Sequence, residues 1–193
     1  KPFGIQPFYP GPGVGGHCIP VDPFYLAWKA REYDFSTRFI ELAGEVNLSM
    51  PYFVVQKAER ILGLQGKSLR GSKVLVLGVT YKEDLPDMRE SPALKVIQLL
   101  VKEGCEVEYY DPYVPSIEIQ LQNQGMHEGK QTVRLDSISE LSAKKVGSAD
   151  LVAVLTGHSC VDYELVVRSA RAVLDTRNAT HRREIVQNNV WQL

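Results

Sequence analysis

The second half of the chain alternates short apolar runs with amphipathic segments, and this alternation restricts the fold more than any other feature. Continuous apolar runs such as 73–78 and 150–155 are typical of parallel strands buried on both faces. Between them, Ser91 and Pro92 form a helix start, and Gly104 suits a helix end. This β-α-β order predicts an α/β fold with a Rossmann-like, doubly wound parallel sheet. We expect strands at 73–78, 105–110, 132–135, 150–155 and 172–174, and helices at 93–103, 137–145 and 163–169.

Polar residues that follow these strands are candidate ligand contacts, because doubly wound sheets bind ligands at the carboxyl ends of their strands. Tyr81, Lys82 and Arg89 follow the first strand, and Asp175 and Arg177 follow the last. Lysine suits a phosphate, tyrosine can stack on a base, and arginine offers a planar fork. The alternative is a set of solvated loop charges, the commoner fate of such residues. Residues 115–130 are polar and poorly patterned, which predicts a surface excursion.

A long helix precedes the sheet region. Ser36 or Thr37 can cap it, and apolar residues recur with helical spacing to Leu62 on more than one stripe. A helix of about 26 residues is ~40 Å long, which is more than one small domain needs. Its second apolar face therefore has to pack against a further partner. Pro51 should kink or restart it, and the alternative is two core helices split at Pro51. The connector 63–72 divides the chain into residues 1–65 and 66–193.

A glycine-dense loop, residues 11–22, comes before both regions. Its glycines at 11, 13 and 16 match the G-x-G-x-x-G pattern of a dinucleotide turn. That turn follows a strand and opens a helix, whereas prolines stand on both sides here, which excludes a Rossmann turn. What remains is a loop whose backbone can approach a phosphate or sugar, followed by Cys18 as a candidate nucleophile. The alternative is a structural turn with a buried, inert thiol. A helix is expected from Phe24 to Arg31, and Tyr9 either stacks on a ligand or, as the sequence favours, anchors the loop.

Charge and cysteine content exclude several classes of protein. The net charge is −1, and the charged residues are scattered along the chain without forming a basic face. This argues against nucleic acid as a partner. No apolar run approaches the ~20 residues of a membrane span, so we expect no membrane partner. Cys18, Cys105 and Cys160 lie far apart without C-x-x-C spacing. This argues against a metal site and predicts reduced thiols in a cytoplasmic protein.

The segment Gly13-Val-Gly-Gly-His-Cys-Ile-Pro-Val-Asp22 resembles the active-site signature of the UDP-glucose/GDP-mannose dehydrogenase family. Further matches follow in the family's order over nearly the whole chain: Gly78-Val-Thr-Tyr-Lys82, Asp87-Met-Arg-Glu-Ser-Pro92, Tyr110-Asp-Pro112 and Leu174-Asp-Thr-Arg177. The resemblance implies an NAD-dependent oxidoreductase that converts the C6 hydroxymethyl of a UDP-sugar to a carboxylate for surface polysaccharide synthesis. It also implies a UDP-binding domain and a homodimer formed through the long central helix. The family's N-terminal NAD-binding domain is absent from these residues, so we expect the chain alone to be inactive.

The resemblance assigns roles to individual residues. Cys18 would hold the aldehyde intermediate as a thiohemiacetal and then a thioester, and Asp22 would order or deprotonate water. Pro20 argues against a shared helical face for these two residues. Carried over by motif, the substrate contacts are Gly13, Gly15, Gly16, Tyr81, Lys82 and Arg177, and Arg89 reaches toward NAD. Leu85 and Pro86 stand where relatives often carry polar residues. The path of this loop, and with it the direction of the Arg89 side chain, can therefore differ from that in relatives.

His17 before the cysteine resembles the branch that oxidises UDP-N-acetylhexosamines. His17 would lower the pKa of the thiol, hydrogen-bond the acetamido group, or only pack the loop. By resemblance, details near Ile19 and Phe24 favour UDP-N-acetylglucosamine over UDP-N-acetylmannosamine. UDP-glucose or GDP-mannose as substrate, and a non-catalytic nucleotide-binding and dimerisation module, are the alternatives.

Overall fold

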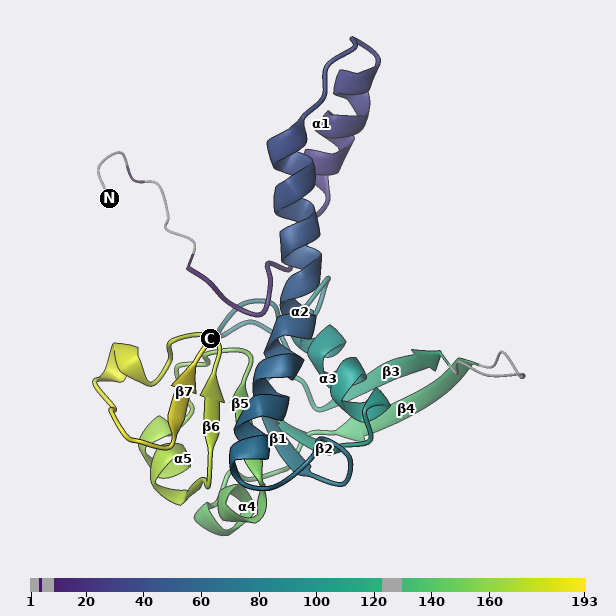
Figure 1. Cartoon of the computed structure of the whole chain (residues 1–193). Helices are drawn as coiled ribbons and strands as arrows, with labels where there is room; N and C mark the ends of the chain where they lie inside the picture. Colours follow the sequence, from purple (N-terminus) through teal and green to yellow (C-terminus); the bar gives the residue numbers. More distant parts are fainter. Residues whose placement is uncertain (1–3, 5–8, 123–129) are drawn as a thin grey trace.

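The computed structural model describes residues 4, 9–122 and 130–193. A long helix runs along the sheet domain and far beyond it, with a shorter helix beside its projecting half (Figure 1). In chain order the elements are α1 (Asp22–Arg31), α2 (Arg38–Leu64), β1 (Lys73–Leu77), α3 (Pro92–Lys102), β2 (Glu106–Tyr110), β3 (Ser116–Gln122), β4 (Lys130–Asp136), α4 (Ala143–Ser148), β5 (Leu151–Val154), α5 (Tyr163–Ser169), β6 (Val173–Asp175), the 3-10 helix η2 (His181–Arg183) and β7 (Val190–Gln192).

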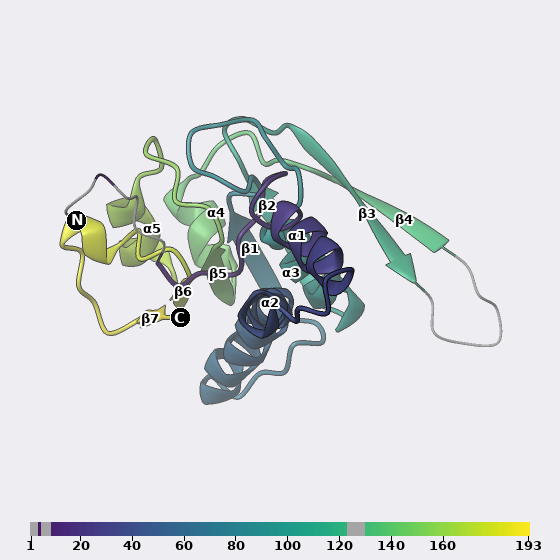
Figure 2. The same cartoon turned by 90° about the horizontal axis from the view of Figure 1, so that it is seen from above.

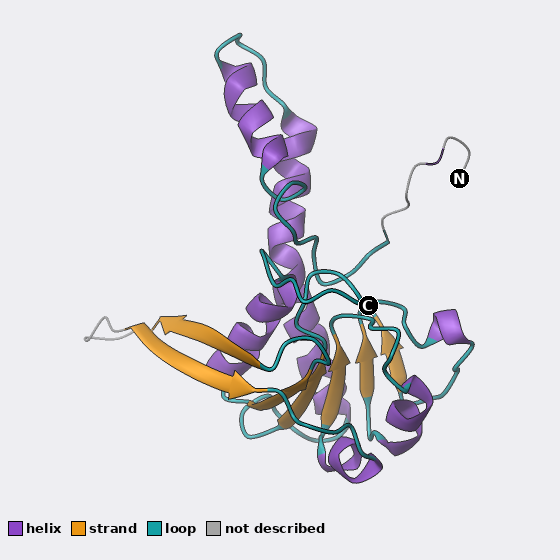
Figure 3. Cartoon of the chain, turned by 180° about the vertical axis from the view of Figure 1, so that it is seen from behind, coloured by secondary structure: helices purple, strands orange, loops and turns teal. Residues whose placement is uncertain are grey.

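The main sheet has the strand order β2-β1-β5-β6-β7, and every neighbouring pair is parallel. Figure 3 shows its strands side by side below the projecting helices. All four residues of β5 are buried, as are four of the five in β1, which explains their continuous apolar sequences. The predicted parallel α/β sheet is confirmed, except that the strand expected at 132–135 lies in β4, which pairs antiparallel with β3 outside the main sheet.

Alternate residues of each strand face different helical layers. Val74 and Val76 of β1 belong to the hydrophobic cluster that includes α2 and α3, whereas Leu75 and Leu77 belong to the cluster with α4 and α5. This alternation follows from the two-residue period of a strand. With helices on both of its faces, the sheet is doubly wound.

Helix α2 is one continuous helix of 27 residues that contains Pro51, so the alternative of two helices split at Pro51 is wrong. Its C-terminal half packs on the sheet through buried residues such as Val54, Ala58 and Ile61. Its N-terminal half projects and contacts α1, where the ring of Phe24 fills the space above Gly44. Pro51 has no N–H, so the carbonyl of Asn47 lacks its helical donor at the level where the glycine loop meets α2.

The segment expected as a surface excursion is in part a strand. Residues 116–122 form β3, which pairs antiparallel with β4 in a two-stranded ribbon. Figure 2 shows this ribbon extending away from the main sheet. Ile117 and Ile119 are buried and belong to the same hydrophobic cluster as α3, so a two-residue apolar period was present among the polar residues. The rest of that prediction, at 123–129, lies outside the described residues.

The remaining differences are small. Helix α4 begins at Ala143 rather than near Ser137, because Ser142 caps it through Lys145 N while the Ser137 hydroxyl bonds the backbone of Asp111. Strand β7 at the sheet edge was not predicted. In the part of the chain that the structure describes, no helix combines the length and apolar character of a membrane span.

Candidate functional site

A cavity of about 1060 Å³ lies where the glycine loop crosses the carboxyl edge of the main sheet. Its walls come from the glycine loop, from α2, and from the loops that follow β1, β5 and β6. The volume is at the upper end of the range for small-molecule sites. Six residues predicted from the sequence as ligand contacts line it: Tyr9, Gly13, Gly15, Tyr81, Lys82 and Arg177.

The glycine loop fits this position because its glycines have no side chains. A Cβ on Gly15 would lie 2.6 Å from the backbone oxygen of Glu90, and one on Gly11 would lie 2.9 Å from the guanidinium of Arg177. Gly16 has a φ of +90° and packs against the ring of Tyr81. These contacts show that glycine lets the loop backbone pack closely against Glu90, Tyr81 and Arg177. The approach of a phosphate or sugar to this backbone stays a prediction.

Two hydrogen-bonded contacts fasten the loop to the rest of the molecule. The Asn47 side chain on α2 accepts from Val14 N at 2.7 Å and donates to Val14 O at 3.3 Å. On the other side, Gly16 N donates to the carbonyl of Arg89 at 2.9 Å. The loop is therefore attached both to the long helix and to the sheet domain.

Arg177 is half-buried, and its guanidinium is oriented by backbone carbonyls. Its Nε donates to Leu155 O at 2.9 Å and its Nη2 to Tyr81 O at 3.3 Å. Burial lowers the pKa of Arg177, and the nearby carboxylate of Glu83 partly opposes that effect. Within the described residues Arg177 and Lys82 form no ion pair, so both cations are available to an anionic ligand in the cavity.

Tyr9 and Arg182 close one side of the cavity. The guanidinium carbon of Arg182 lies 5.8 Å from the centre of the Tyr9 ring, within cation–π range. The same guanidinium is 3.8 Å from the carboxylate of Glu83. Tyr9 is 67% exposed, and the anchoring role that the sequence favoured for its ring stays a prediction.

Cys18, His17 and Asp22 lie on exposed backbone next to the cavity and are not among its lining residues. The Cys18 carbonyl accepts from Asp22 N at 2.8 Å, so a single turn that leads into α1 joins the two residues. Helix α1 begins at Asp22, so Cys18 and Pro20 lie in the turn before it and not within the helix, as the argument from Pro20 against a shared helical face expects. A thiol and a carboxylate thus emerge from the same turn.

Arg89 and Asp87 form a bidentate ion pair near the thiol. The Arg89 Nη2 lies 2.6 Å from Asp87 Oδ2, and Arg89 Nε lies 3.1 Å from both carboxylate oxygens. Hydrogen bonds from Arg89 hold the pKa of Asp87 at about 2. Leu85 and Pro86 are exposed in the loop before this pair, and the guanidinium is directed at Asp87 rather than at the cavity.

Sequence reasoning missed several residues of the cavity wall, among them Asn47, Thr156, Gly157 and Arg182. Thr156 and Gly157 follow β5, so the strand-end rule that found Tyr81 and Arg177 also applies to them. Asn47 and Arg182 carry no such signal, because their position depends on contacts between distant parts of the chain. No group of three or more His, Cys, Asp or Glu side chains in the described ranges lies close enough together to hold a metal ion.

Two family profiles match the chain. Residues 75–182 match the "UDP-glucose/GDP-mannose dehydrogenase family, UDP binding domain", and residues 1–49 match the central domain of the same family. The chain is 36% identical over 181 residues to the UDP-N-acetyl-D-mannosamine dehydrogenase of Methanocaldococcus jannaschii, covering 90% of this chain and 36% of that protein. It is 33% identical over 156 residues to the UDP-N-acetyl-D-glucosamine 6-dehydrogenase of Salmonella typhi, covering 81% of this chain and 33% of that protein.

A solved structure gives the same result at the level of the fold. The UDP-D-ManNAc dehydrogenase from Pyrococcus horikoshii superposes with a TM-score of 0.71 and 27% identity, covering 99% of this chain and 41% of that one. The chain therefore spans about a third of the length of the curated relatives quoted above. Since the UDP-binding profile alone matches more than half of its residues, the chain belongs to the UDP-glucose/GDP-mannose dehydrogenase family.

Proposed function

We propose that this chain supplies the nucleophile loop and the UDP-sugar-binding domain of an NAD-dependent UDP-N-acetylhexosamine 6-dehydrogenase. One observation carries the proposal. The glycine loop, which carries Cys18, is fastened across the carboxyl edge of the sheet. Other residues of this loop line one cavity together with Tyr81, Lys82 and Arg177. A diphosphate would meet Lys82 and the Arg177 fork, and the base or ribose would meet the Tyr9 and Arg182 side. Gly13, Gly15 and Gly16 allow the sugar to approach the loop backbone.

Cys18 performs the covalent steps of the proposed reaction. Its thiolate adds to the C6 aldehyde carbon, and the resulting thiohemiacetal keeps the aldehyde from escaping. Oxidation of that adduct leaves a thioester, which water hydrolyses to the carboxylate and the free thiol. Asp22, one turn from Cys18, is the proposed general base that orders or deprotonates this water.

NAD⁺ is the proposed oxidant, and when bound it accepts a hydride in each oxidation. A dinucleotide turn needs a strand, a glycine pattern and a helix in succession, and the prolines on both sides of the glycine loop argue against such a turn there. Of the described residues we assign only Arg89 to the cofactor. Its guanidinium is exposed and keeps donors beyond those that Asp87 uses, so it suits a phosphate.

The proposed substrate is a UDP-N-acetylhexosamine. His17 stands beside Cys18 and is exposed, so it can reach an acetamido group, and proteins named for both the manno and the gluco epimer are among the relatives. The three cysteines are free thiols, which supports the proposed cytoplasmic location.

Calorimetric titration of the chain tests the proposal. UDP, UDP-N-acetylglucosamine, UDP-N-acetylmannosamine, UDP-glucose and GDP-mannose are each titrated into the wild type and into Arg177→Met. We expect binding of the UDP ligands, a preference for one N-acetylated sugar, and an affinity at least about tenfold lower in the variant. Equal weak binding of all five ligands, or no binding, would contradict the assignment of the cavity.

We also propose that two copies of the chain associate through the projecting half of α2. Phe39 is 89% exposed and Leu42 is 55% exposed on this half, and α1 adds Trp28 at 65%. Within residues 9–122 and 130–193 nothing covers this apolar surface, and a helix of this length needs a second packing partner.

A further inference from the structure

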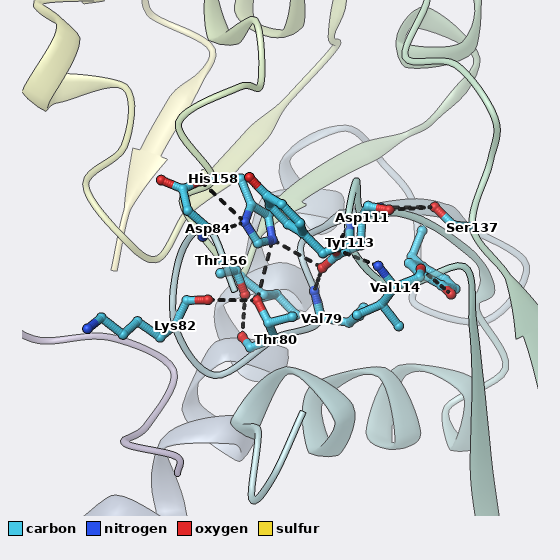
Figure 4. A network of polar contacts seen from close by, with 12 residues as sticks. Val79, Thr80, Lys82, Asp84, Asp111, Tyr113, Val114, Ser137, Thr156 and His158 are labelled. Atoms are coloured by element: carbon cyan, nitrogen blue, oxygen red, sulfur yellow. Dashed lines mark hydrogen bonds and ion pairs between the residues drawn. The ribbon is translucent and has the colours of Figure 1, made fainter. Parts of the chain in front are cut away.

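A buried polar network joins three strand ends directly behind the cavity (Figure 4). Asp111 follows β2, His158 follows β5, and the segment from Val79 to Asp84 follows β1. His158 is fully buried, and Asp111 is 4% exposed. Neither residue was predicted as functional, and neither lines the cavity. The segment that they contact, however, presents Tyr81 and Lys82.

The hydrogen bonds determine which ring nitrogen of His158 carries the proton. Asp84 N donates to His158 Nδ1 at 3.0 Å, so Nδ1 must be an acceptor. The proton is therefore on Nε2, which faces Asp111 Oδ2 at 3.1 Å. The ring is a neutral bridge between a buried carboxylate and a loop amide. Replacing it by an apolar side chain would leave the Asp84 amide without its acceptor and would remove one donor from the Asp111 carboxylate, which keeps its bond from Val79 N.

The same segment is held at nearly every peptide. Asp111 Oδ2 accepts from Val79 N at 2.7 Å, and Thr156 donates to the carbonyl of Thr80 at 2.6 Å. The hydroxyl of Thr80 donates to the carbonyl of Lys82 at 2.8 Å. The backbone around Tyr81 and Lys82 is thus specified by side chains that come from other strands.

Asp84 is the strained end of this segment. Its φ of +60° lies in the left-handed region, which is uncommon for residues other than glycine, although aspartate adopts it more readily than most. Two bonds with the loop after β5 hold it there: the amide of Asp84 donates to His158, and its carboxylate accepts from Ser159 N at 2.9 Å. Without the His158 acceptor, nothing else in the described structure binds the amide of Asp84.

We propose that His158 is a positioning residue whose Nδ1 fixes the Tyr81–Asp84 segment and thereby places Tyr81 and Lys82 in the cavity. The effect on ligand binding rests on the function proposed above. The effect on the segment itself does not, so the two can be separated by experiment.

Two variants divide the functions of the ring. His158→Asn keeps an acceptor near the Nδ1 position and loses the donor to Asp111, whereas His158→Gln keeps a donor near Nε2 and loses the acceptor for Asp84 N. Each variant loses one bond, so their thermal stabilities should fall by similar amounts. Val166→Ala, in the hydrophobic cluster on the other face of the sheet, is the control for lowered stability alone.

The first measurement is backbone amide exchange of Asp84 by NMR. We expect protection in the wild type, in His158→Asn and in Val166→Ala, and at least about tenfold faster exchange in His158→Gln. The second is the affinity for UDP, which should fall about tenfold in His158→Gln and less than about threefold in the other two.

The outcomes distinguish the two proposals. If wild-type protein does not bind UDP but the exchange pattern holds, the proposed function is wrong and the positioning role stands. If Asn and Gln variants speed Asp84 exchange equally, or if affinity follows thermal stability across all three variants, His158 is only part of the core and the positioning role is wrong.

Discussion

At the scale of single residues, the three thiols of this chain differ in their surroundings. Cys18 and Cys160 are exposed, whereas Cys105 is buried and donates to the carbonyl of Leu69 at 3.1 Å. Burial raises the pKa of Cys105 to about 11. At pH 8 roughly 0.1% of such a thiol is ionised, and the thiolate is the reactive form.

Alkylation with iodoacetamide at pH 8 should therefore label Cys18 and Cys160 and spare Cys105 in the folded chain. Peptide mass spectrometry reads the three sites, and unfolding in urea should expose the third. Saturating UDP-N-acetylhexosamine should slow the labelling of Cys18 but leave Cys160 unchanged, which makes Cys160 the internal control. Equal protection of both thiols, or of neither, would argue against the placement of the sugar beside Cys18.

Asp111 is the residue whose ionisation should matter most for stability. Burial alone would raise its pKa, but hydrogen bonds from His158 and from the amides of Val79 and Tyr113 bring the pKa below its usual value. A carboxylate of this kind stabilises the fold above its unfolded-state pKa of about 4, and the stabilisation is lost as the pH falls through the folded-state value.

Asp111→Asn should lower the free energy of unfolding at pH 7 by about 1–3 kcal/mol, and the difference from wild type should shrink below about pH 4. Urea unfolding at pH 7, 5 and 3 measures it. Asp136→Asn removes an exposed acid beside Arg134 and should change little at any pH. If the free energy of unfolding of Asp111→Asn differed from that of wild type by the same amount at every pH, the carboxylate would stabilise the fold through its shape and not through its charge.

At the scale of elements, the turn out of β1 leaves no room for a side chain at Gly78. Gly78 has a φ of +81°, and a Cβ there would collide with Thr156 and lie 2.8 Å from its carbonyl oxygen. Both the backbone conformation and the lack of space require glycine at this position.

Gly78→Ala should therefore destabilise the chain by about 2–4 kcal/mol in thermal or urea unfolding. Gly63 provides the matched control, because it lies in the last turn of α2 and a methyl group added there would meet nothing within 4 Å. Gly63→Ala should stabilise by roughly 0.5–1 kcal/mol. If both substitutions act in the same direction, the turn after β1 is not restricted as described.

The elements differ in how well the sequence predicts them. Strands β1 and β5 were predictable because both of their faces are buried, which leaves an uninterrupted apolar run. β3 was missed because its buried face, Ile117 and Ile119, alternates with the exposed residues Glu118 and Gln120. The strand-end rule located Tyr81 and Arg177. It cannot locate Asn47, whose partner Val14 is 33 residues away in the sequence, since no local pattern encodes that contact.

At the scale of the whole molecule, the projecting half of α2 and its companion α1 stand apart from the sheet domain, as Figure 1 shows. The aromatic side chains there include Trp28, Tyr33 and Phe39, all more than half exposed. The length of the helix was predictable from its periodicity, whereas the surface that covers it in an assembly is a property of more than one chain.

We expect the chain to self-associate, and the double substitution Phe39→Gln with Leu42→Gln to weaken that association by at least about tenfold. Sedimentation velocity over a concentration series measures the change. Leu64, 71% exposed at the opposite end of the same helix, gives the control: Leu64→Gln should leave the association unchanged. A wild-type chain that stays monomeric, or a control that dissociates as readily, would refute the interface on the projecting half.

The double attachment of the glycine loop has a consequence for ligand capture. Ordering one residue's backbone costs about 1–2 kcal/mol in conformational entropy. Val14 is bound to Asn47 and Gly16 to the carbonyl of Arg89, so the stretch leading to Cys18 is already ordered when the chain folds. The arriving sugar need not immobilise that stretch again, and its binding energy is left for holding the reacting carbon against the thiol.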